Sequence, residues 1–461
     1  MNNRKYNVDV VLGSQLGDEG KGRLIDILAS KYDIVARCNS GGNAGHKVIV
    51  GDKTYAFHLI PSGILNPNCI GIIGNGCVIN LQDLHKEIDT IQNTLNKSDD
   101  NIMKRLLISD RAHIVINAHK EADASRELQK SKSSNPKSVI GTTKQGMGPV
   151  YSTKALRVGL RMCDIFLDKD ILREKVKGLC EELESGLGYE IYVEQVMQDI
   201  EDEIEFFRPM VIDTITYLNM AINNGCKVLV EIAQACLLDI DFGVYPYCTA
   251  TNCSVGAVCS GLGIPAHCIG KINYVLKTYC TRVGNGPFPT ELGGEVNGGG
   301  VNGGGVNGGG YVGSLLGEKM QVIGKEYGTT TSRKRRCGWL DIPMVKWATM
   351  INGTGNGSGS ASLCLIKLDV LDTFEEIKLA ISYKIDGNEI YGFPSSLENL
   401  AKVEVVYEVF QGWMTPTTGI RNVNDLPDNA KIYLRRIEEL LEIPIKFIGV
   451  GAERDSIICI E

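Results

Sequence analysis

The sequence predicts an α/β fold, formed by a large single domain with a mostly parallel central sheet, a P-loop-like nucleotide site, and helical and loop insertions. Two observations predict this class. Short β-branched and apolar runs, which are typical of buried strands, alternate with glycine-rich turns and with charged helical stretches. The first run also leads directly into a glycine-rich turn and a helical pattern, an order that suits phosphate binding.

Strands are expected where a short apolar run ends in glycine or polar residues. These runs are 8–12, 34–38, 47–50, 70–74, 227–232, 363–366 and 443–450. The ranges 81–127 and 165–225 carry many charges and predict helices. Because strands are interleaved with helices along the chain, the sheet between them is expected to be mostly parallel.

Composition narrows the class of protein. Of the 461 residues, 43% are hydrophobic and 22% are charged, which is typical of a soluble globular protein. The net charge of −7 argues against a general nucleic-acid binder. No apolar run reaches the roughly 18 residues of a membrane span, and the first residues do not form a signal peptide, so a cytoplasmic location is expected. The 15 cysteines contain no C-x-x-C pair, which favours reduced thiols over disulfides or a zinc site.

One segment differs from the rest of the predicted domain, which covers residues 1–461. Between residues 293 and 313 the sequence Val-Asn-Gly-Gly-Gly occurs three times, at 296–300, 301–305 and 306–310. A repeat of this composition has little to bury, so we expect a surface loop insertion without a catalytic part.

The glycine-rich turn at 13–22 reads GSQLGDEGKG. Free backbone N–H groups at the start of a helix point toward a phosphate, and Lys21 adds a cation. The Walker A spacing is not met, because Gln15 stands where a glycine is needed and Gly22 where a hydroxyl is needed. Asp18 is unusual in a loop that favours anions, and it suggests Mg²⁺ binding, proton transfer, or both. A structural turn is the simpler alternative, but it requires neither Asp18 nor Lys21.

Two further loops carry polar groups among glycines. The loop 39–46 (NSGGNAGH) ends in His46, a candidate proton donor or acceptor, although a lone histidine is more often structural. The loop 141–149 (GTTKQGMGP) suits a phosphate or a sugar, and it fits an ordinary connector equally well.

The basic run 329–336 (TTTSRKRR) combines hydroxyls with guanidinium groups and suits a small dicarboxylate, although such runs also form solvated surfaces. Lys367 and Asp369 form a K-x-D element, which resembles one that reads guanine and is weak evidence alone.

In this order, the segments resemble the adenylosuccinate synthetase family, in a form more eukaryotic than bacterial, from about residue 6 to 459. The motifs that carry the resemblance are GDEGKG (17–22), NAGH (43–46), HLIPSG (58–63), IGNG (73–76), GTTKQGMGP (141–149), LLDIDFG (237–243), TRVGNGPFPTE (281–291), RKRRCGWLD (333–341) and KLDVLD (367–372). The resemblance implies a GTP-dependent ligase of purine biosynthesis that joins IMP and L-aspartate through 6-phosphoryl-IMP.

The resemblance also implies roles for single residues. Asp18 is the expected general base toward N1 of IMP, and it is the expected Mg²⁺ ligand together with the backbone carbonyl of Gly45. His46, Lys21 and Gln234 complete the expected catalytic set. The implied GTP site comprises Gly17, Asp18, Glu19, Gly20, Lys21, Gly22, Gly45, His46, Lys47, Arg335, Lys367, Asp369, Gly449 and Gly451.

Sites for the other two substrates are implied in the same way. The IMP site would comprise Asp18, Lys21, Asn43, Gly45, His46, Thr143, Arg157, Gln234, Thr249 and Arg333. The L-aspartate site would comprise Thr329, Thr330, Thr331, Ser332, Arg333 and Arg335. Arg157 matches an arginine that reaches the IMP site of a partner subunit, so a homodimer is expected, with neither nucleic acid nor membrane as a partner.

Three positions depart from the family pattern: Ile232 and Ser332 stand where glycine is usual, and Ala452 stands where a lysine is often found. A β-branched residue at 232 would be strained if that position required a positive φ. A catalytically weakened relative kept for binding therefore stays open. A GTP-binding switch that ligates nothing is a second alternative, and it would need neither the Asp18–His46 pair nor the Arg333–Arg335 site.

Overall fold

The computed structural model describes residues 6–50, 53–95, 101–132, 139–293, 311–328, 333–355 and 360–460. Its centre is a ten-stranded sheet. The strand order is β19 (Ile457–Cys459), β18 (Ile445–Gly449), β14 (Ala361–Ile366), β11 (Ile269–Lys277), β1 (Val8–Gly13), β10 (Val228–Ala235), β2 (Ile34–Arg37), β5 (Ile70–Ile73), β7 (Leu106–Ser109) and β9 (Val211–Ile212). All neighbours pair in parallel except β18 and β19, so the predicted α/β class with a mostly parallel sheet is confirmed.

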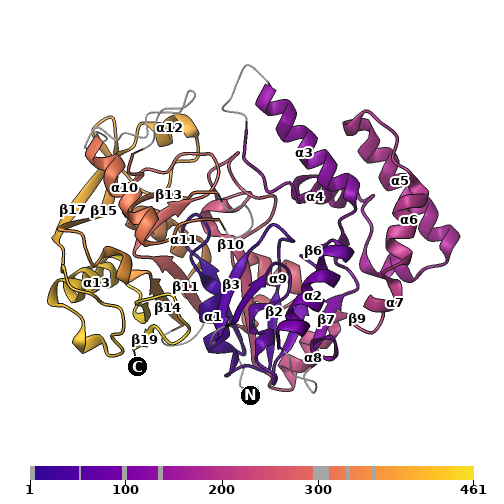
Figure 1. Cartoon of the computed structure of the whole chain (residues 1–461), viewed down its shortest axis with the longest axis horizontal. Helices are drawn as coiled ribbons and strands as arrows, with labels where there is room; N and C mark the ends of the chain where they lie inside the picture. The colour runs from indigo at the N-terminus through magenta and orange to yellow at the C-terminus, as the bar shows by residue number, and fades with distance from the viewer. Residues whose placement is uncertain are drawn as a thin grey trace.

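Smaller sheets flank the central one. A five-stranded sheet contains β12 (Tyr279–Arg282), β13 (Arg336–Asp341), β15 (Glu376–Ile385), β16 (Asn388–Ile390) and β17 (Glu404–Gln411). Two short pairs are formed by β3 (His46–Val50) with β4 (Lys53–Phe57) and by β6 (Val78–Ile79) with β8 (His113–Ile114). In Figure 1, β15 and β17 lie at one end of the molecule and the central strands occupy its middle.

The α-helices of the described ranges are α1 (Lys21–Ala29), α2 (Leu81–Leu95), α3 (Asn117–Lys132), α4 (Met147–Leu156), α5 (Lys169–Leu187), α6 (Val193–Glu201), α7 (Ile204–Phe207), α8 (Thr214–Asn223), α9 (Gly256–Leu262), α10 (Tyr311–Ile323), α11 (Ile342–Asn352), α12 (Leu397–Ala401) and α13 (Asp428–Leu441). Within these ranges, none of the helices combines the length and apolar character needed to cross a bilayer.

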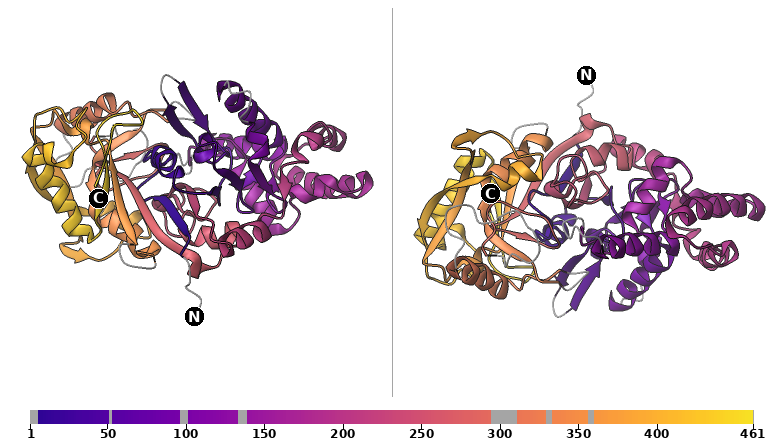
Figure 2. Two further views of the ribbon diagram at one scale, coloured as in Figure 1. Left: turned by 90° about the horizontal axis from the view of Figure 1, so that it is seen from below. Right: turned by 90° about the horizontal axis from the view of Figure 1, so that it is seen from above.

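Helices cover both faces of the central sheet, because side chains alternate along each strand. In β1, Val10 belongs to the same buried cluster as Leu218 of α8. The next residue, Val11, points the other way and packs in a cluster with Leu24 of α1. The magenta helices α5 and α6 extend from the end of the molecule opposite the orange and yellow C-terminal part (Figures 1 and 2). The result is a layered core with helices on both faces of the sheet.

Most expected strands are present, with two kinds of correction. The range 47–50 lies in the β3–β4 hairpin rather than in the central sheet. The prediction of helix throughout 81–127 and 165–225 is wrong at β7, β8 and β9. The run that forms β7 is only four residues long and is flanked by charged residues. For this reason the sequence did not indicate a strand there, although β7 pairs with both β5 and β9.

Two further expectations concern particular segments. Residues 294–310, which include the glycine repeat, lie outside the described residues, and α10 already begins at Tyr311, so the expected loop at 293–313 is three residues too long at its end. Ile232 is fully buried within β10. The positive φ of this strand belongs to Gln234 and not to residue 232, so the strain considered for Ile232 does not arise.

Candidate active site

A cavity of about 1120 Å³ opens beyond the carboxyl ends of the central strands. It is lined by the turn after β1, by the loop before β3, by Gln234 near the end of β10 and by Lys367 after β14. Ligands of open α/β sheets bind at this edge, because the connecting loops and the helix N-termini converge there.

The turn after β1 lines this cavity, and it is the glycine-rich turn in which the sequence predicted a phosphate site. Gly17, Asp18 and Gly20 all have left-handed backbones, with φ of 94°, 59° and 83°. Helix α1 begins directly afterwards at Lys21, so its unpaired N–H groups face the cavity edge. A Cβ on Gly13 would lie 2.3 Å from Oε2 of Glu19, so the close approach of this carboxylate requires glycine there.

Glu19 holds this turn from the inside. Its Oε1 accepts hydrogen bonds from the backbone N–H of Gln15 (3.2 Å) and of Gly17 (2.9 Å), and its Oε2 pairs with Nζ of Lys21 at 3.1 Å. Glu19 is fully buried and does not line the cavity. Lys21 does line it, and its Nζ also donates to the backbone carbonyl of Gln234.

Asp18 points from the turn toward Arg335, a basic residue that also lines the cavity. Its Oδ2 lies 3.0 Å from Nε of Arg335, and its side chain keeps 28% exposure. The sequence separation of 317 residues shows that the fold, and not local sequence, makes this pair. The carboxylate of Asp18 and the guanidinium group of Arg335 therefore form an ion pair beside the glycine-rich turn.

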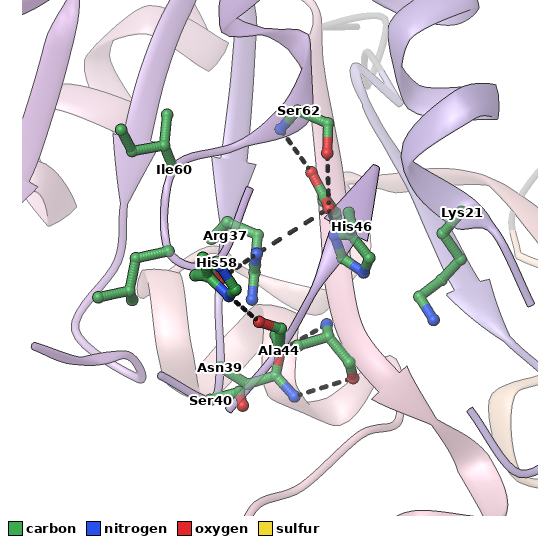
Figure 3. A network of polar contacts seen from close by, with 12 residues as sticks. Lys21, Arg37, Asn39, Ser40, Ala44, His46, His58, Ile60 and Ser62 are labelled. Atoms are coloured by element: carbon green, nitrogen blue, oxygen red, sulfur yellow. Dashed lines mark hydrogen bonds and ion pairs between the residues drawn. The ribbon is translucent and has the colours of Figure 1, made fainter. Parts of the chain in front are cut away.

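His46 belongs to a second polar group, built around a carboxylate that the sequence analysis did not select. Nδ1 of His46 lies 2.5 Å from Oε1 of Glu231. Glu231 also accepts hydrogen bonds from the backbone N–H (2.9 Å) and from Oγ (3.1 Å) of Ser62, and Nη1 of Arg37 is 4.0 Å away. Figure 3 shows Ser62, Arg37 and His46 converging, with Lys21 on the other side of His46.

The charges of this group follow from its burial. Burial alone would raise the pKa of Glu231, but His46, Arg37 and the hydrogen bonds from Ser62 outweigh it and lower that pKa to about 2. Burial lowers the pKa of His46, against the opposing effect of Glu231. Glu231 is thus ionised at neutral pH, and it fixes the orientation of the imidazole through Nδ1.

The predicted guanine-binding pair lies together at another part of the cavity lining. Lys367 has a left-handed backbone, with φ of 67°, and its Nζ donates to the carbonyl of Gly324. Asp369 carries a buried oxygen, Oδ1, that accepts no hydrogen bond within the described part of the chain. Burial raises the pKa of Asp369, while Lys367 lowers it. A buried, unpaired acceptor is costly unless a ligand supplies a donor, so this position fits the N–H groups of a base.

Other predicted residues fall into three groups. Residues of the IMP and GTP sets that line the cavity are Gly17, Gly20, Gly22, Asn43, Gly45, His46, Thr143, Thr249, Arg333 and Gly451. Arg157 is exposed at the end of α4, and neither it nor Gly449 contributes to the lining. Thr329, Thr330, Thr331 and Ser332 lie outside the described residues, as does the side chain of Lys47.

Arg333 contacts the loop 141–149. Its Nη2 donates to the carbonyl of Gly141 at 2.8 Å. Two carboxylates of α3 hold the same loop, because Glu127 accepts from the backbone N–H of Gly141 (2.9 Å) and Asp123 from that of Gly146 (3.1 Å). This loop is therefore held at Gly141 and at Gly146 beside the cavity.

A metal cage made by the protein alone is not found, since no three His, Cys, Asp or Glu side chains gather suitably in the described ranges. Mg²⁺ does not need one, because it commonly takes one or two protein oxygens and completes its shell with phosphates and water. The part-exposed carboxylate of Asp18 and the cavity-lining Gly45 fit that requirement.

A glycine-rich turn at the carboxyl edge of a parallel sheet, together with the unpaired acceptor of Asp369, is typical of an α/β enzyme that acts on phosphorylated nucleotides. Comparison with known proteins identifies its family. The adenylosuccinate synthetase family model matches residues 10–458. Adenylosuccinate synthetase from Drosophila virilis is 44% identical over 456 residues, which is 98% of this chain and 94% of the relative.

Solved structures agree with that match. The fully ligated adenylosuccinate synthetase of Plasmodium falciparum is 38% identical, with a TM-score of 0.87 over 99% of this chain and 100% of that one. Succinoaminodeoxyadenylate synthetase of cyanophage S-2L, at 18% identity and a TM-score of 0.57, shares the fold. The chain belongs to the adenylosuccinate synthetase family, and it is a GTP-dependent ligase that joins IMP and L-aspartate in purine biosynthesis.

Proposed function

We propose that ligation proceeds in two steps, with Asp18 as the general base. Asp18 takes the N1 proton of IMP, O6 attacks the γ-phosphate of GTP, and the bond from that phosphorus to GDP breaks. The amine of L-aspartate then attacks C6, the C6–O bond to phosphate breaks, and the amine gives up one proton. The observation that carries this proposal is the position of the Asp18 carboxylate, part-exposed in the cavity and beside the N-terminus of α1.

Lys21, His46 and Gln234 would stabilise the transferred phosphoryl group. Lys21 is 1% exposed and is now paired with Glu19 and the carbonyl of Gln234, so a bound phosphate would take over one of these contacts. Burial lowers the pKa of His46 in the free protein, and phosphate charge would raise it. The protonated imidazole, held by Glu231 through Nδ1, would then donate from Nε2.

Mg²⁺ would be held by Asp18 and the backbone carbonyl of Gly45, and it would neutralise charge on the phosphates. These ligands fit because both residues line the same cavity. Substrates would supply the remaining oxygens.

Each substrate would occupy a separate part of the cavity wall. Guanine would bind at Lys367 and Asp369, where the unpaired Oδ1 accepts its N–H groups. The phosphates of GTP would meet the turn 17–22, with Gly45, His46, Lys47 and Arg335 nearby and the turn of Gly449 and Gly451 beyond. IMP would contact Asn43, Thr143, Gln234, Thr249 and Arg333. L-Aspartate would contact Thr329, Thr330, Thr331, Ser332, Arg333 and Arg335.

The active form would be a cytoplasmic homodimer. Arg157 is exposed and lies outside its own chain's cavity, which supports a role in the IMP site of a second copy. A guanidinium group suits the phosphate of IMP, because it can form two parallel hydrogen bonds.

A steady-state assay that omits IMP, GTP, L-aspartate and Mg²⁺ in turn tests this proposal. Adenylosuccinate should form only when all four are present, and ATP should not replace GTP. Phosphate release that ignores IMP and L-aspartate would contradict the proposal and favour a nucleotide switch. No turnover in any mixture would indicate a weakened relative kept for binding.

A further inference from the structure

Glu326 is a fully buried carboxylate that does not line the cavity, yet it contacts residues that do. It follows α10, and its Oε2 lies 2.8 Å from Nζ of Lys277 and 2.6 Å from Nη1 of Arg335. Its Oε1 accepts a hydrogen bond from the hydroxyl of Tyr279 at 2.5 Å and lies 3.7 Å from Nζ of Lys367. Three cations therefore surround one carboxylate.

The surroundings hold Glu326 in its charged form. Burial alone would raise its pKa, but Lys277, Lys367 and Arg335 outweigh it and lower the pKa to about 2. Lys277 is itself buried, and its Nζ donates a second hydrogen bond to Oγ1 of Thr281. A neutral side chain at 326 would leave cations in a poorly solvated region without their shared counter-charge.

Two of the three cations reach different parts of the active site. Arg335 extends beyond Glu326 to Asp18, with Nε 3.0 Å from Oδ2. Lys367 belongs to the predicted guanine site, and its Nζ is tied to the carbonyl of Gly324, two residues before Glu326. Residues 324–326 thus contact both Lys367 of the predicted guanine site and Arg335, which pairs with the proposed base Asp18.

The backbone strengthens this connection. The N–H of Arg335 donates to the carbonyl of Glu326 at 3.0 Å, and the N–H of Gly328 donates to the carbonyl of Arg333 at 2.8 Å. These bonds form an antiparallel pair of short segments, in which Arg335 is bonded to Glu326 and Arg333 to Gly328. The side chain and the backbone of one residue therefore fix the same arginine.

We propose that Glu326 is a positioning residue that links the guanine site to the L-aspartate site by holding Lys367 and Arg335 in place. The inference rests on the proposed substrate sites described above. It differs from a purely structural role, in which Glu326 would only compensate the buried charge of Lys277. The two roles predict different kinetics.

The test is the variant Glu326→Gln, which keeps the shape of the side chain and removes its charge. We expect KM for GTP and KM for L-aspartate to rise together by about tenfold or more, since the contacts are cooperative. KM for IMP should stay within about twofold, and the dissociation constant of GDP, measured by calorimetry without other substrates, should rise with KM for GTP.

Asp341→Asn is a matched control. Asp341 is fully buried, contacts the hydroxyl of Tyr383 and the backbone N–H of Met344, and does not line the cavity. Its loss should leave all three KM values and the GDP affinity unchanged. A second variant, Lys277→Met with Glu326→Gln, removes one excess cation and keeps the test valid where Glu326→Gln alone fails to fold.

The outcomes separate this inference from the proposed function. Higher KM values for GTP and L-aspartate, with an unchanged KM for IMP, support the positioning role of Glu326. This holds for Glu326→Gln alone and for Glu326→Gln combined with Lys277→Met. Unchanged GDP affinity, or a uniform loss of activity in which all KM values stay constant, would overturn it and leave Glu326 with a structural role. A wild-type protein without ligase turnover would instead refute the proposed function, while the GDP measurement would still report on Glu326.

Discussion

Glu231 and Glu326 are both fully buried, and the pKa of each is lowered to about 2, yet the fold holds them in different ways. Glu231 lies within β10, directly opposite Arg37 of the neighbouring parallel strand. Glu326 lies on the connection after α10, and the side chains around it, with one backbone hydrogen bond to Arg335, define its place. A carboxylate on a central strand is positioned by backbone hydrogen bonds to the strands on both sides. A carboxylate on a loop is positioned mainly by the side chains that it contacts.

This difference indicates that the two carboxylates serve different parts of the reaction. Glu231 contacts His46, next to the phosphate turn, and should serve phosphoryl transfer. Glu326 contacts Arg335 and, at longer range, Lys367, and should serve binding. Variants of single residues test this difference, and Asp18, the proposed base, comes first.

Asp18 is the proposed base and pairs with Arg335, which also contacts Glu326, so its loss should have the largest effect. In Asp18→Asn we expect kcat to fall about 10³- to 10⁴-fold, because the amide cannot accept the N1 proton. Asparagine tolerates the left-handed backbone at this position, where φ is 59°, so the thermal midpoint should stay close to that of the wild type. Steady-state kinetics and thermal melts measure both, and appreciable turnover in a folded variant would refute the assignment of the base.

Loss of the Glu231 carboxylate should lower kcat more than it raises the KM values. In Glu231→Gln, His46 loses the charge that orients it and stabilises its protonated form, so kcat should fall about 10²-fold. KM for GTP and for L-aspartate should change by less than about twofold. A rise in these KM values like that expected for Glu326→Gln would remove the distinction between the two regions.

Acid should destabilise the protein through the same carboxylates. The pKa of Glu231 is about 2 in the folded protein against an ordinary value of 4.5, so its contribution is fully present above pH 4.5 and is lost as the pH falls toward 2. A difference of this size corresponds to roughly 3 kcal/mol of unfolding free energy. Urea titrations between pH 6 and pH 3 should show a shallower pH dependence in Glu231→Gln than in the wild type. An unchanged slope would contradict the ionised, paired state of Glu231.

Arg157 lies outside both regions and should show the most restricted effect. In Arg157→Leu we expect KM for IMP to rise about tenfold, because a charged hydrogen bond to phosphate is lost. KM values for GTP and L-aspartate should not change. An unaltered KM for IMP would argue against a site shared between two subunits.

The part of the fold that follows local patterns could be predicted from the sequence. The turn 13–22 and the strand before it follow from adjacent residues, and the structure places both as expected. Strand β7 was missed because it is short and has charged residues on both sides.

The two buried carboxylates could not be predicted, because their partners are distant in the sequence. Ser62 and Glu231 are 169 residues apart, and Lys277 and Glu326 are 49 apart. A weak signal existed for Glu231, since a charged residue within the apolar run 228–233 needs a buried partner. Glu326 had no such signal, because it follows a helix among polar residues.

The most direct test of the division between the two regions is the phosphoryl-transfer half-reaction alone. Exchange of ¹⁸O between the bridging and non-bridging positions of the β- and γ-phosphates of GTP, with IMP present and L-aspartate absent, measures that step. At saturating GTP we expect Glu231→Gln to slow the exchange about as much as it slows turnover, while Glu326→Gln exchanges at nearly the wild-type rate. Equal loss of exchange in both variants would contradict the account, since the two carboxylates would then serve the same step.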